Sequence, residues 1–260
     1  MSSLLRGLVV QGEVVHAVIM RETRTRFGEH RLGYLWALLE PAIVIMTFWG
    51  VFVIAKRHVA DGFDVFSFVA TGLIPYALFG SCANRVAEAI NGNKSLLSYP
   101  QVLPIDLAIA RWLLELATYT AVFIILMGVH ALWKRELTID RPLLVLSGLA
   151  MASLLGAALG LVFCGLGQWN NTVDRARGPL LRPLFWISGV FFTAAMLPDH
   201  TRAGMLRNPV LHVSEMVRDG WSPQYESPYA DPIYVLQWTL FLALTGLVLE
   251  RWVRRRIEMS

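Results

Sequence analysis

Few residues of this chain have the types and spacing that catalysis requires. His212 and Glu215 stand three positions apart on an expected helix and offer two metal ligands, whereas a bound metal normally takes three or four protein ligands. We therefore favour a hydrogen-bonded pair at the surface. The stretch Gly92-Asn93-Lys94-Ser95 comes nearest to a phosphate-binding loop, but that motif needs glycine where Asn93 stands. We expect no metal, cofactor or nucleotide site in this chain.

An intramembrane protease is the enzyme class that an apolar chain most readily suggests. It would need a serine nucleophile and a histidine base at the same depth. Ser188 lies in an apolar stretch, but none of the six histidines falls well inside one. We expect no enzymatic activity.

Three charged residues lie within apolar stretches, where ionisable groups are costly and often functional. Arg111 and Glu115 have the i,i+4 spacing of an ion pair on one helix, and the long stem of Arg111 can reach the membrane interface. We favour this structural pair over a role in substrate binding. Glu40 precedes Pro41 and either caps backbone groups that the proline frees or faces a water-filled path. Both interpretations remain open.

The composition indicates that these residues lie on helices of a membrane protein. Apolar residues make up 55% of the 260 positions and charged residues 16%, against about 25% charged in an ordinary soluble domain. The mean hydropathy is +0.52. The net charge of +4 is spread between apolar blocks, so an anionic membrane is a better partner than nucleic acid. We predict an all-α protein that crosses a membrane several times.

The apolar stretches predict six transmembrane helices, because about 20 residues cross a hydrocarbon layer roughly 30 Å thick. Their approximate ranges are 34–55, 65–83, 107–133, 142–169, 183–198 and 232–249. The fifth range is short for a complete crossing, so it either stops short or leads into a re-entrant segment. Residues 33–251 would form the transmembrane domain, and residues 252–260 a basic cytoplasmic tail.

Lysine and arginine set the orientation. With the N-terminus inside, 14 of the 23 basic residues lie in cytoplasmic segments and 8 in outer ones. We therefore place both termini in the cytoplasm.

The first 32 residues predict an amphipathic helix on the cytoplasmic membrane surface. Apolar residues recur at helical spacing without the continuous run or cleavage site of a signal peptide. Three arginines would reach lipid phosphates, namely Arg21, Arg24 and Arg26. A solvated basic linker is the alternative.

Two loops are predicted to hold short helices. In the inner loop 84–106, a helix near Val86–Ile90 would break at Asn91-Gly92 and stop before Pro100 and Pro104. The inner segment after Trp169 reads as a polar, basic loop. In the outer segment 199–231, Asn208-Pro209 has the pattern of an N-cap followed by proline at the first helical position. That helix would have one apolar side, rest on or dip into the membrane, and stop at Gly220.

Two stretches carry a resemblance to a known family. The stretch RETRTRFG at 21–28, continuing as RLGYLWALLEP at 31–41, looks like the entry to the first span of type-2 ABC exporter permeases. The stretch NPVLH at 208–212, with Glu215, Arg218 and Gly220, resembles the capsular-polysaccharide branch of that family.

The resemblance implies a bacterial inner-membrane permease that exports lipid-linked capsular polysaccharide. Its partners would be a second copy of itself, two ATP-binding subunits that hold ATP and Mg²⁺, membrane lipids, and periplasmic and outer-membrane export proteins. It also implies short re-entrant helices between spans five and six.

The resemblance further implies three groups of site residues. The cargo or lipid-headgroup entrance would comprise Arg21, Arg24, Arg26, Tyr34, Trp36 and Glu40. The ATPase-coupling segment would comprise Asn91, Lys94, Ser95, Leu96 and Tyr99. The periplasmic gate would comprise Asn208, Pro209, His212, Glu215 and Arg218.

Other functions remain as alternatives. The cargo would be O-antigen or teichoic acid in a related exporter. An ion-coupled secondary transporter would need carboxylates or broken helices near the membrane midplane, and only Glu40 and Glu115 are candidates.

Overall fold

The computed structural model describes residues 3–27, 32–99, 101–135 and 139–257, and all of its regular elements are helical. The long helices are α1 (Ser3–Phe27), α2 (Leu32–Ile54), α3 (Val65–Ala87), α4 (Pro104–Lys134), α5 (Pro142–Gly167), α6 (Asn171–Ile187) and α9 (Pro232–Ile257). The short elements are the 3₁₀ helices η1 (Asn91–Leu96) and η2 (Ala194–Met196), together with α7 (Asp199–Met205) and α8 (Pro209–Trp221). The all-α prediction is confirmed for these residues.

Five of the described helices are long and apolar enough to cross a membrane: α2, α3, α4, α5 and α9. The predicted fifth span, 183–198, is not one helix. The polar segment after Trp169, predicted as a loop, instead forms α6, which begins where the Asn170 side chain caps Thr172 N. α6 ends at Ile187, and Gly189 then turns the chain with φ +73°. A side chain at Gly189 would also collide with Leu211, so the break depends on glycine.

Small residues bring α3 and α5 into close contact at the centre of the bundle. A Cβ atom on Gly160 of α5 would lie 2.8 Å from the carbonyl oxygen of Ala83, and one on Gly156 would overlap the carbonyl of Phe79. Such small residues let helix backbones approach closely in membranes. On another side, Gly165 of α5 and Gly246 of α9 give these two helices the same close packing.

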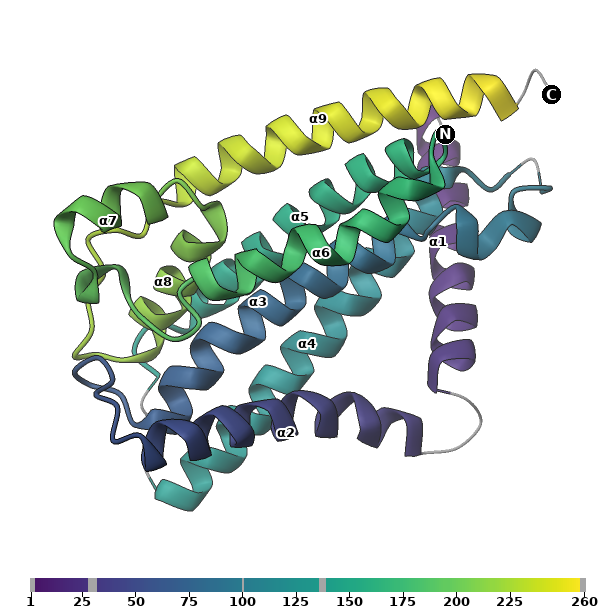
Figure 1. The fold of residues 1–260 in the computed structure, drawn as a ribbon. Coiled ribbons are helices and arrows are strands. Elements are labelled where there is room, and N and C mark those ends of the chain that lie inside the picture. The colour runs from purple at the N-terminus through teal and green to yellow at the C-terminus, as the bar shows by residue number, and fades with distance from the viewer. Residues whose placement is uncertain (1–2, 28–31, 100, 136–138, 258–260) are drawn as a thin grey trace.

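α1 crosses the ends of the spanning helices at the end of the molecule that also holds η1 and the C-terminal part of α9 (Figure 1). We call this the α1 end. Val15 and Val18 of α1 are buried in a cluster with Val86 and Leu107, while Val9 is half exposed. The buried part of the apolar face therefore packs on protein, and the predicted position on a membrane surface applies at most to the rest.

α7 and α8 lie at the opposite end, which we call the α8 end (Figure 1). The predicted cap of α8 is confirmed, because Asn208 Oδ1 accepts a hydrogen bond from Val210 N at 3.1 Å. The helix has one apolar side, as predicted, but its predicted place resting on the membrane is wrong, because every residue from Val210 to Trp221 is buried. Gly220 does not stop the helix either. It lets the start of α5 approach, with Arg141 O 2.9 Å from where its Cβ would be.

Candidate functional site

The turn between α3 and α4 at the α1 end is the candidate site. α3 extends to Ala87, so Val86 belongs to it rather than to a separate short helix. The short helix lies further along, at Asn91–Leu96, and α4 begins with Pro104 at its first position. Pro104 therefore starts a helix where we expected it to stop one, while Pro100 lies outside the described residues.

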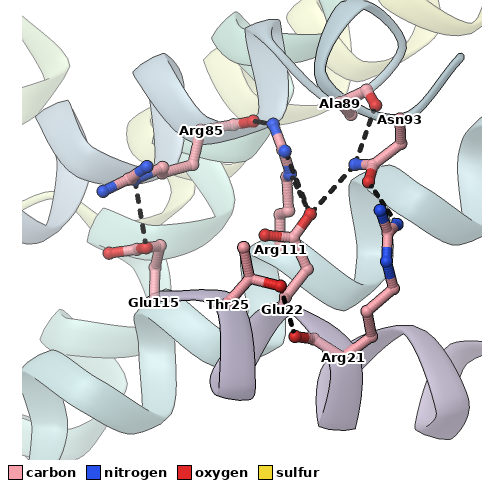
Figure 2. A network of polar contacts seen from close by, with 8 residues as sticks. All are labelled: Arg21, Glu22, Thr25, Arg85, Ala89, Asn93, Arg111 and Glu115. Atoms are coloured by element: carbon pink, nitrogen blue, oxygen red, sulfur yellow. Dashed lines mark hydrogen bonds and ion pairs between the residues drawn. The ribbon is translucent and has the colours of Figure 1, made fainter. Parts of the chain in front are cut away.

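Asn93 in η1 is hydrogen-bonded to two residues of α1. Arg21 Nη1 donates to Asn93 Oδ1 at 2.9 Å, and Asn93 Nδ2 donates to Glu22 Oε1 at 2.9 Å and to Ala89 O at 3.2 Å (Figure 2). The Asn93 side chain is buried, and its backbone leaves helical geometry with φ −136°. Both ends of its amide are thus occupied by contacts that hold η1 against α1.

Arg111 of α4 completes this network. Its Nε donates to Glu22 Oε1 at 3.0 Å, its Nη1 donates to Arg85 O at 3.0 Å, and Glu22 and Arg111 form an ion pair (Figure 2). A Cβ on Gly92 would lie 2.7 Å from Arg111 Nη2, so glycine leaves room for the guanidinium.

The predicted pair of Arg111 with Glu115 is wrong. The carboxylate of Glu115 instead accepts a hydrogen bond from Ser81 Oγ at 2.6 Å and lies 3.7 Å from Arg85 Nε. The i,i+4 spacing allowed a pair within α4, but partners on α1 and α3 lie closer to each side chain's terminal group.

Glu22 is ionised within this network. Burial alone would raise the pKa of Glu22, but the hydrogen bond from Asn93 and the positive charges of Arg111 and Arg21 outweigh burial and lower it. Its contacts with Arg111 and with the Asn93 amide are therefore charge-assisted, the stronger kind of hydrogen bond.

α6 holds the opposite side of η1. Gln168 donates to Asn91 Oδ1 at 3.0 Å, and Asn91 Nδ2 donates to Asp174 Oδ2 at 3.4 Å. Arg177 of α6, which is buried, forms an ion pair with Glu88 at 2.5 Å. η1 is thus hydrogen-bonded to both α1 and α6.

The predicted coupling residues divide into two groups. Asn91 is held by α6 and the end of α5, as described above. Lys94, Ser95 and Tyr99 are exposed and Leu96 is half-buried, with Tyr99 61% exposed. Lys94, Ser95 and Tyr99 form the outward face of the segment, which we call the η1 face, and it is open to contact with another protein. Leu96 lies at the edge of this face and packs against the apolar cluster that includes Val15 and Val86.

The predicted entrance residues do not form one group. Arg21 is bound to Asn93, whereas Arg24 is exposed. Trp36 and Glu40 on α2 are exposed, and no described residue donates a hydrogen bond to Glu40. The side chains of Arg26 and Tyr34 lie outside the described residues.

The predicted gate residues do come together, as a buried polar cluster around α8. Asn208 Nδ2 donates to Ile187 O at 3.1 Å, and Glu215 accepts from Ala194 N at 2.9 Å and from Tyr225 at 2.6 Å. This cluster fastens α8, which begins at Pro209, to the turn after α6 and to the segment before α9.

Arg218 is, like Glu215, a fully buried charge of that cluster. It donates to Phe192 O at 2.8 Å and Val190 O at 3.1 Å, and its guanidinium stacks 4.3 Å from the centre of the Phe68 ring. Because its partners are backbone carbonyls of the turn after α6, Arg218 holds the shape of that turn.

His212 and Glu215 are not the expected surface pair. Both are buried, and His212 Nε2 lies 2.7 Å from Leu206 O while Nδ1 accepts from Asp231 N at 3.2 Å. These contacts direct the imidazole toward backbone groups, whereas Glu215 binds Ala194 and the 225–227 segment. No group of three potential metal ligands occurs among the residues that the structure describes.

Glu22 and Asn93 were missed from the sequence. Their separation of 71 residues gives no periodic signal. They are identified only in the fold, where Asn93 is buried beside Gly92, whose lack of a side chain leaves room for Arg111.

Comparison with known proteins agrees with this arrangement. Residues 13–221 match the ABC-2 type transporter family. The polysialic acid transport protein KpsM of Escherichia coli is 35% identical, over 94% of this chain and 95% of its own length. The capsule polysaccharide export inner-membrane protein BexB of Haemophilus influenzae is 31% identical, over 97% and 96%. The O-antigen export system permease protein RfbA of Myxococcus xanthus is 22% identical, over 91% and 90%. This chain belongs to the ABC-2 type transporter family.

Proposed function

We propose that this chain is the membrane-spanning subunit of an ATP-driven exporter of capsular polysaccharide in the bacterial inner membrane. The observation that carries the proposal is similarity over nearly the whole chain to relatives named for capsule export. The described fold supports it, because five membrane-crossing helices offer a scaffold for a path across the bilayer.

Energy comes from a separate ATP-binding subunit that docks on the η1 face in the cytoplasm. The support for this step is the exposure of Lys94, Ser95 and Tyr99 on a segment whose inner side is fixed by α1 and α6. A rigidly held, outward-facing segment transmits a push from a docked protein to the helices behind it. Two copies of this chain would take two such subunits.

The cargo is lipid-linked polysaccharide, and it enters beside α2. The side chains of Arg24, Trp36 and Glu40 are exposed there. Because Glu40 is exposed, we favour a Glu40 that faces the cargo over one that caps backbone groups freed by Pro41. Arg21 acts inside the α1–η1 network rather than on the cargo. On the far side, periplasmic and outer-membrane proteins receive the polymer.

The chain crosses the membrane a sixth time through α6 and the turn that follows it. α6 is 17 residues long and polar along one side, which suits a helix that faces its counterpart in a second copy. The turn after α6, with α7 and α8, then forms the re-entrant gate, held by Asn208, His212, Glu215 and Arg218. Both termini lie in the cytoplasm.

O-antigen is the second candidate cargo, because RfbA is similar over most of both chains. Its identity is lower than that of the capsule-named relatives, so capsule is favoured. An ion-coupled transporter has no comparable support.

Deleting the gene and analysing surface polysaccharide tests the proposal. We expect capsule to disappear from the surface and its lipid-linked precursor to accumulate inside, with recovery when the gene is supplied on a plasmid. Normal surface capsule in the deletion strain would contradict capsule export. Loss of O-antigen with intact capsule would favour the second candidate.

A further inference from the structure

A polar cavity at the α8 end carries an inference beyond the export path. Its volume is about 220 Å³, and it lies between the start of α3, the end of α4 and the segment after α8. The side chains that line it include Asp64, Ser67, His130, Lys134, Trp221 and Gln224. Hydrogen-bonding groups from three separate elements thus converge on one hollow.

Asp64 organises the cavity wall. As the N-cap of α3, it accepts hydrogen bonds from the backbone N of Phe66 at 3.1 Å and of Ser67 at 3.4 Å. Its carboxylate also accepts from Ser67 Oγ at 2.8 Å and pairs with Lys134 Nζ at 3.2 Å. Because these contacts fix the carboxylate, its orientation toward the cavity is set before any ligand arrives.

His130 supports the Asp64 carboxylate, and Lys134 presents donors that the protein leaves partly unused. His130 stacks on Phe66, with ring centres 4.3 Å apart, so its ring plane is fixed. Its Nε2 lies 3.0 Å from Asp64 Oδ2 but is buried without an aligned hydrogen-bond partner among the described residues. Lys134 carries three donors, and its one described ion pair is with Asp64.

The cavity therefore offers a carboxylate, an imidazole, an ammonium, a hydroxyl and an amide within one small space, with the Trp221 ring on its wall. A ligand that fits must both donate and accept hydrogen bonds on several sides, and the hydroxyl groups of a sugar do both.

We propose that this cavity binds one sugar residue of the exported polymer as it leaves the membrane. The proposal rests on the proposed function and on the orientation that places the α8 end outside. Lys134 donates to sugar hydroxyls, the Gln224 amide donates to them and accepts from them, Asp64 and His130 hold Lys134 and the cavity wall in place, and Trp221 bounds the space. An occupied cavity gives the emerging chain a resting point, which disfavours backward sliding.

Two variants test the site without removing the helix cap. Asp64→Asn keeps a strong N-cap residue but loses the charge, and Lys134→Met keeps the apolar stem and loses the donors. Asp61→Asn is the matched control, because Asp61 is exposed in the same loop and does not line the cavity. All are placed in lipid nanodiscs, since sugar-headed detergents would compete for the site.

Binding is measured by saturation-transfer NMR with glucose, glucuronic acid and N-acetylglucosamine, and inorganic phosphate serves as a competitor. We expect at least one sugar to bind the wild type and the Asp61 control, and about tenfold weaker binding in each cavity variant, as loss of a charged hydrogen-bond partner predicts. Equal sugar binding in all four proteins would overturn the proposal. Displacement of the sugar by phosphate at equal concentration would also overturn it, because the site would then be a simple anion site.

The export assay separates this proposal from the proposed function. If the deletion strain keeps its capsule, the proposed function fails whatever the NMR shows. If the deletion strain loses its capsule and neither cavity variant changes sugar binding, only the sugar site fails.

Discussion

At the residue scale, the polar contacts at the α1 end depend on a few side chains with several roles each. Glu22 binds Asn93 and Arg111, and Asn93 in turn binds Arg21. Removing one member leaves charged or amide groups half-buried without a partner, which costs more than the lost contact alone. Single substitutions therefore test the network directly.

Replacing Glu22 by Gln removes the charge that Arg111 and Arg21 share. We expect the protein to lose about 1.5–3 kcal/mol of stability, because hydrogen bonds to charged groups contribute about that much. The loss is read as a lower Tm in nanodiscs. Glu13→Gln, at an exposed position of the same helix, is the control and leaves the Tm unchanged. Equal Tm values for both variants would show that the network does not stabilise the fold.

The Asp64 carboxylate predicts a pH dependence at the α8 end. Burial alone would raise the pKa of Asp64, but the Ser67 hydrogen bond and the neighbouring His130 and Lys134 lower it below its ordinary value of 3.8. Because the pKa is lowered in the folded state, the ionised form stabilises the fold above pH 3.8, and this contribution is lost as the pH falls through the folded pKa. We expect the Tm difference between wild type and Asp64→Asn to be largest near neutral pH and to shrink below pH 3.8. A difference independent of pH would contradict this assignment.

At the element scale, α5 is the central helix, and η1 is the segment that is hydrogen-bonded to both α1 and α6. Glycines on α5 let α3 and α9 pack closely on two sides. η1 is held on its inner side and open on its outer face. Helix packing thus decides stability, whereas the η1 face is the surface on which we propose that the ATP-binding subunit docks.

Replacing Gly156 by Val is expected to destabilise the α3–α5 contact. Even a Cβ atom there would overlap the Phe79 carbonyl, and overpacking of this kind costs about 1–3 kcal/mol. Gly128→Val on α4 is the control, because no atom lies within 4 Å of where its Cβ would be. The Tm in nanodiscs should fall clearly for Gly156→Val and far less for the control. The reverse order would contradict the packing.

Replacing Tyr99 on the η1 face, or Leu96 at its edge, by Asp tests the coupling role. We expect the ATP-binding subunit to co-purify less with either variant and transport to stop, because a charge in an apolar protein contact is desolvated without a partner. Lys56→Glu, at an exposed site of the α8 end, should leave both unchanged. Normal assembly together with normal transport in the η1 variants would remove this face from the coupling role.

At the scale of the whole molecule, the two ends differ in kind. The α1 end carries exposed basic and polar groups around η1, and the α8 end holds a buried polar cluster and the polar cavity. A transporter that takes energy on one side and releases cargo on the other needs such an asymmetry. Which end faces the cytoplasm decides how both are used.

Cysteine labelling determines the orientation. The native Cys82 and Cys164 are buried, so the unaltered protein should remain unlabelled and serves as the control. In intact cells without an outer membrane, a membrane-impermeant maleimide should label Asp61→Cys and not Ser95→Cys. After permeabilisation both should react. The opposite pattern would place the α1 end outside and contradict cytoplasmic ATPase docking.

Sequence alone determined the features that depend on local pattern and composition. Long apolar runs specify membrane-crossing helices because lipid leaves backbone groups no partner except each other, and α2, α3, α4, α5 and α9 were all predicted. The Asn208-Pro209 signature located the start of α8 because capping is a local interaction. The stretches at 21–41 and 208–220 indicated the family.

Only the tertiary structure decided what depends on distant partners. Arg111 pairs with Glu22, 89 positions away, although Glu115 stands at the ideal local spacing. α8 is covered on all sides by other elements, although its pattern has one apolar face. α6 occupies a segment that reads as a loop, because its polar groups find partners on η1 and the end of α3. Local spacing shows which contacts a helix permits, whereas packing between helices selects the partner that gives each buried charge the lowest free energy.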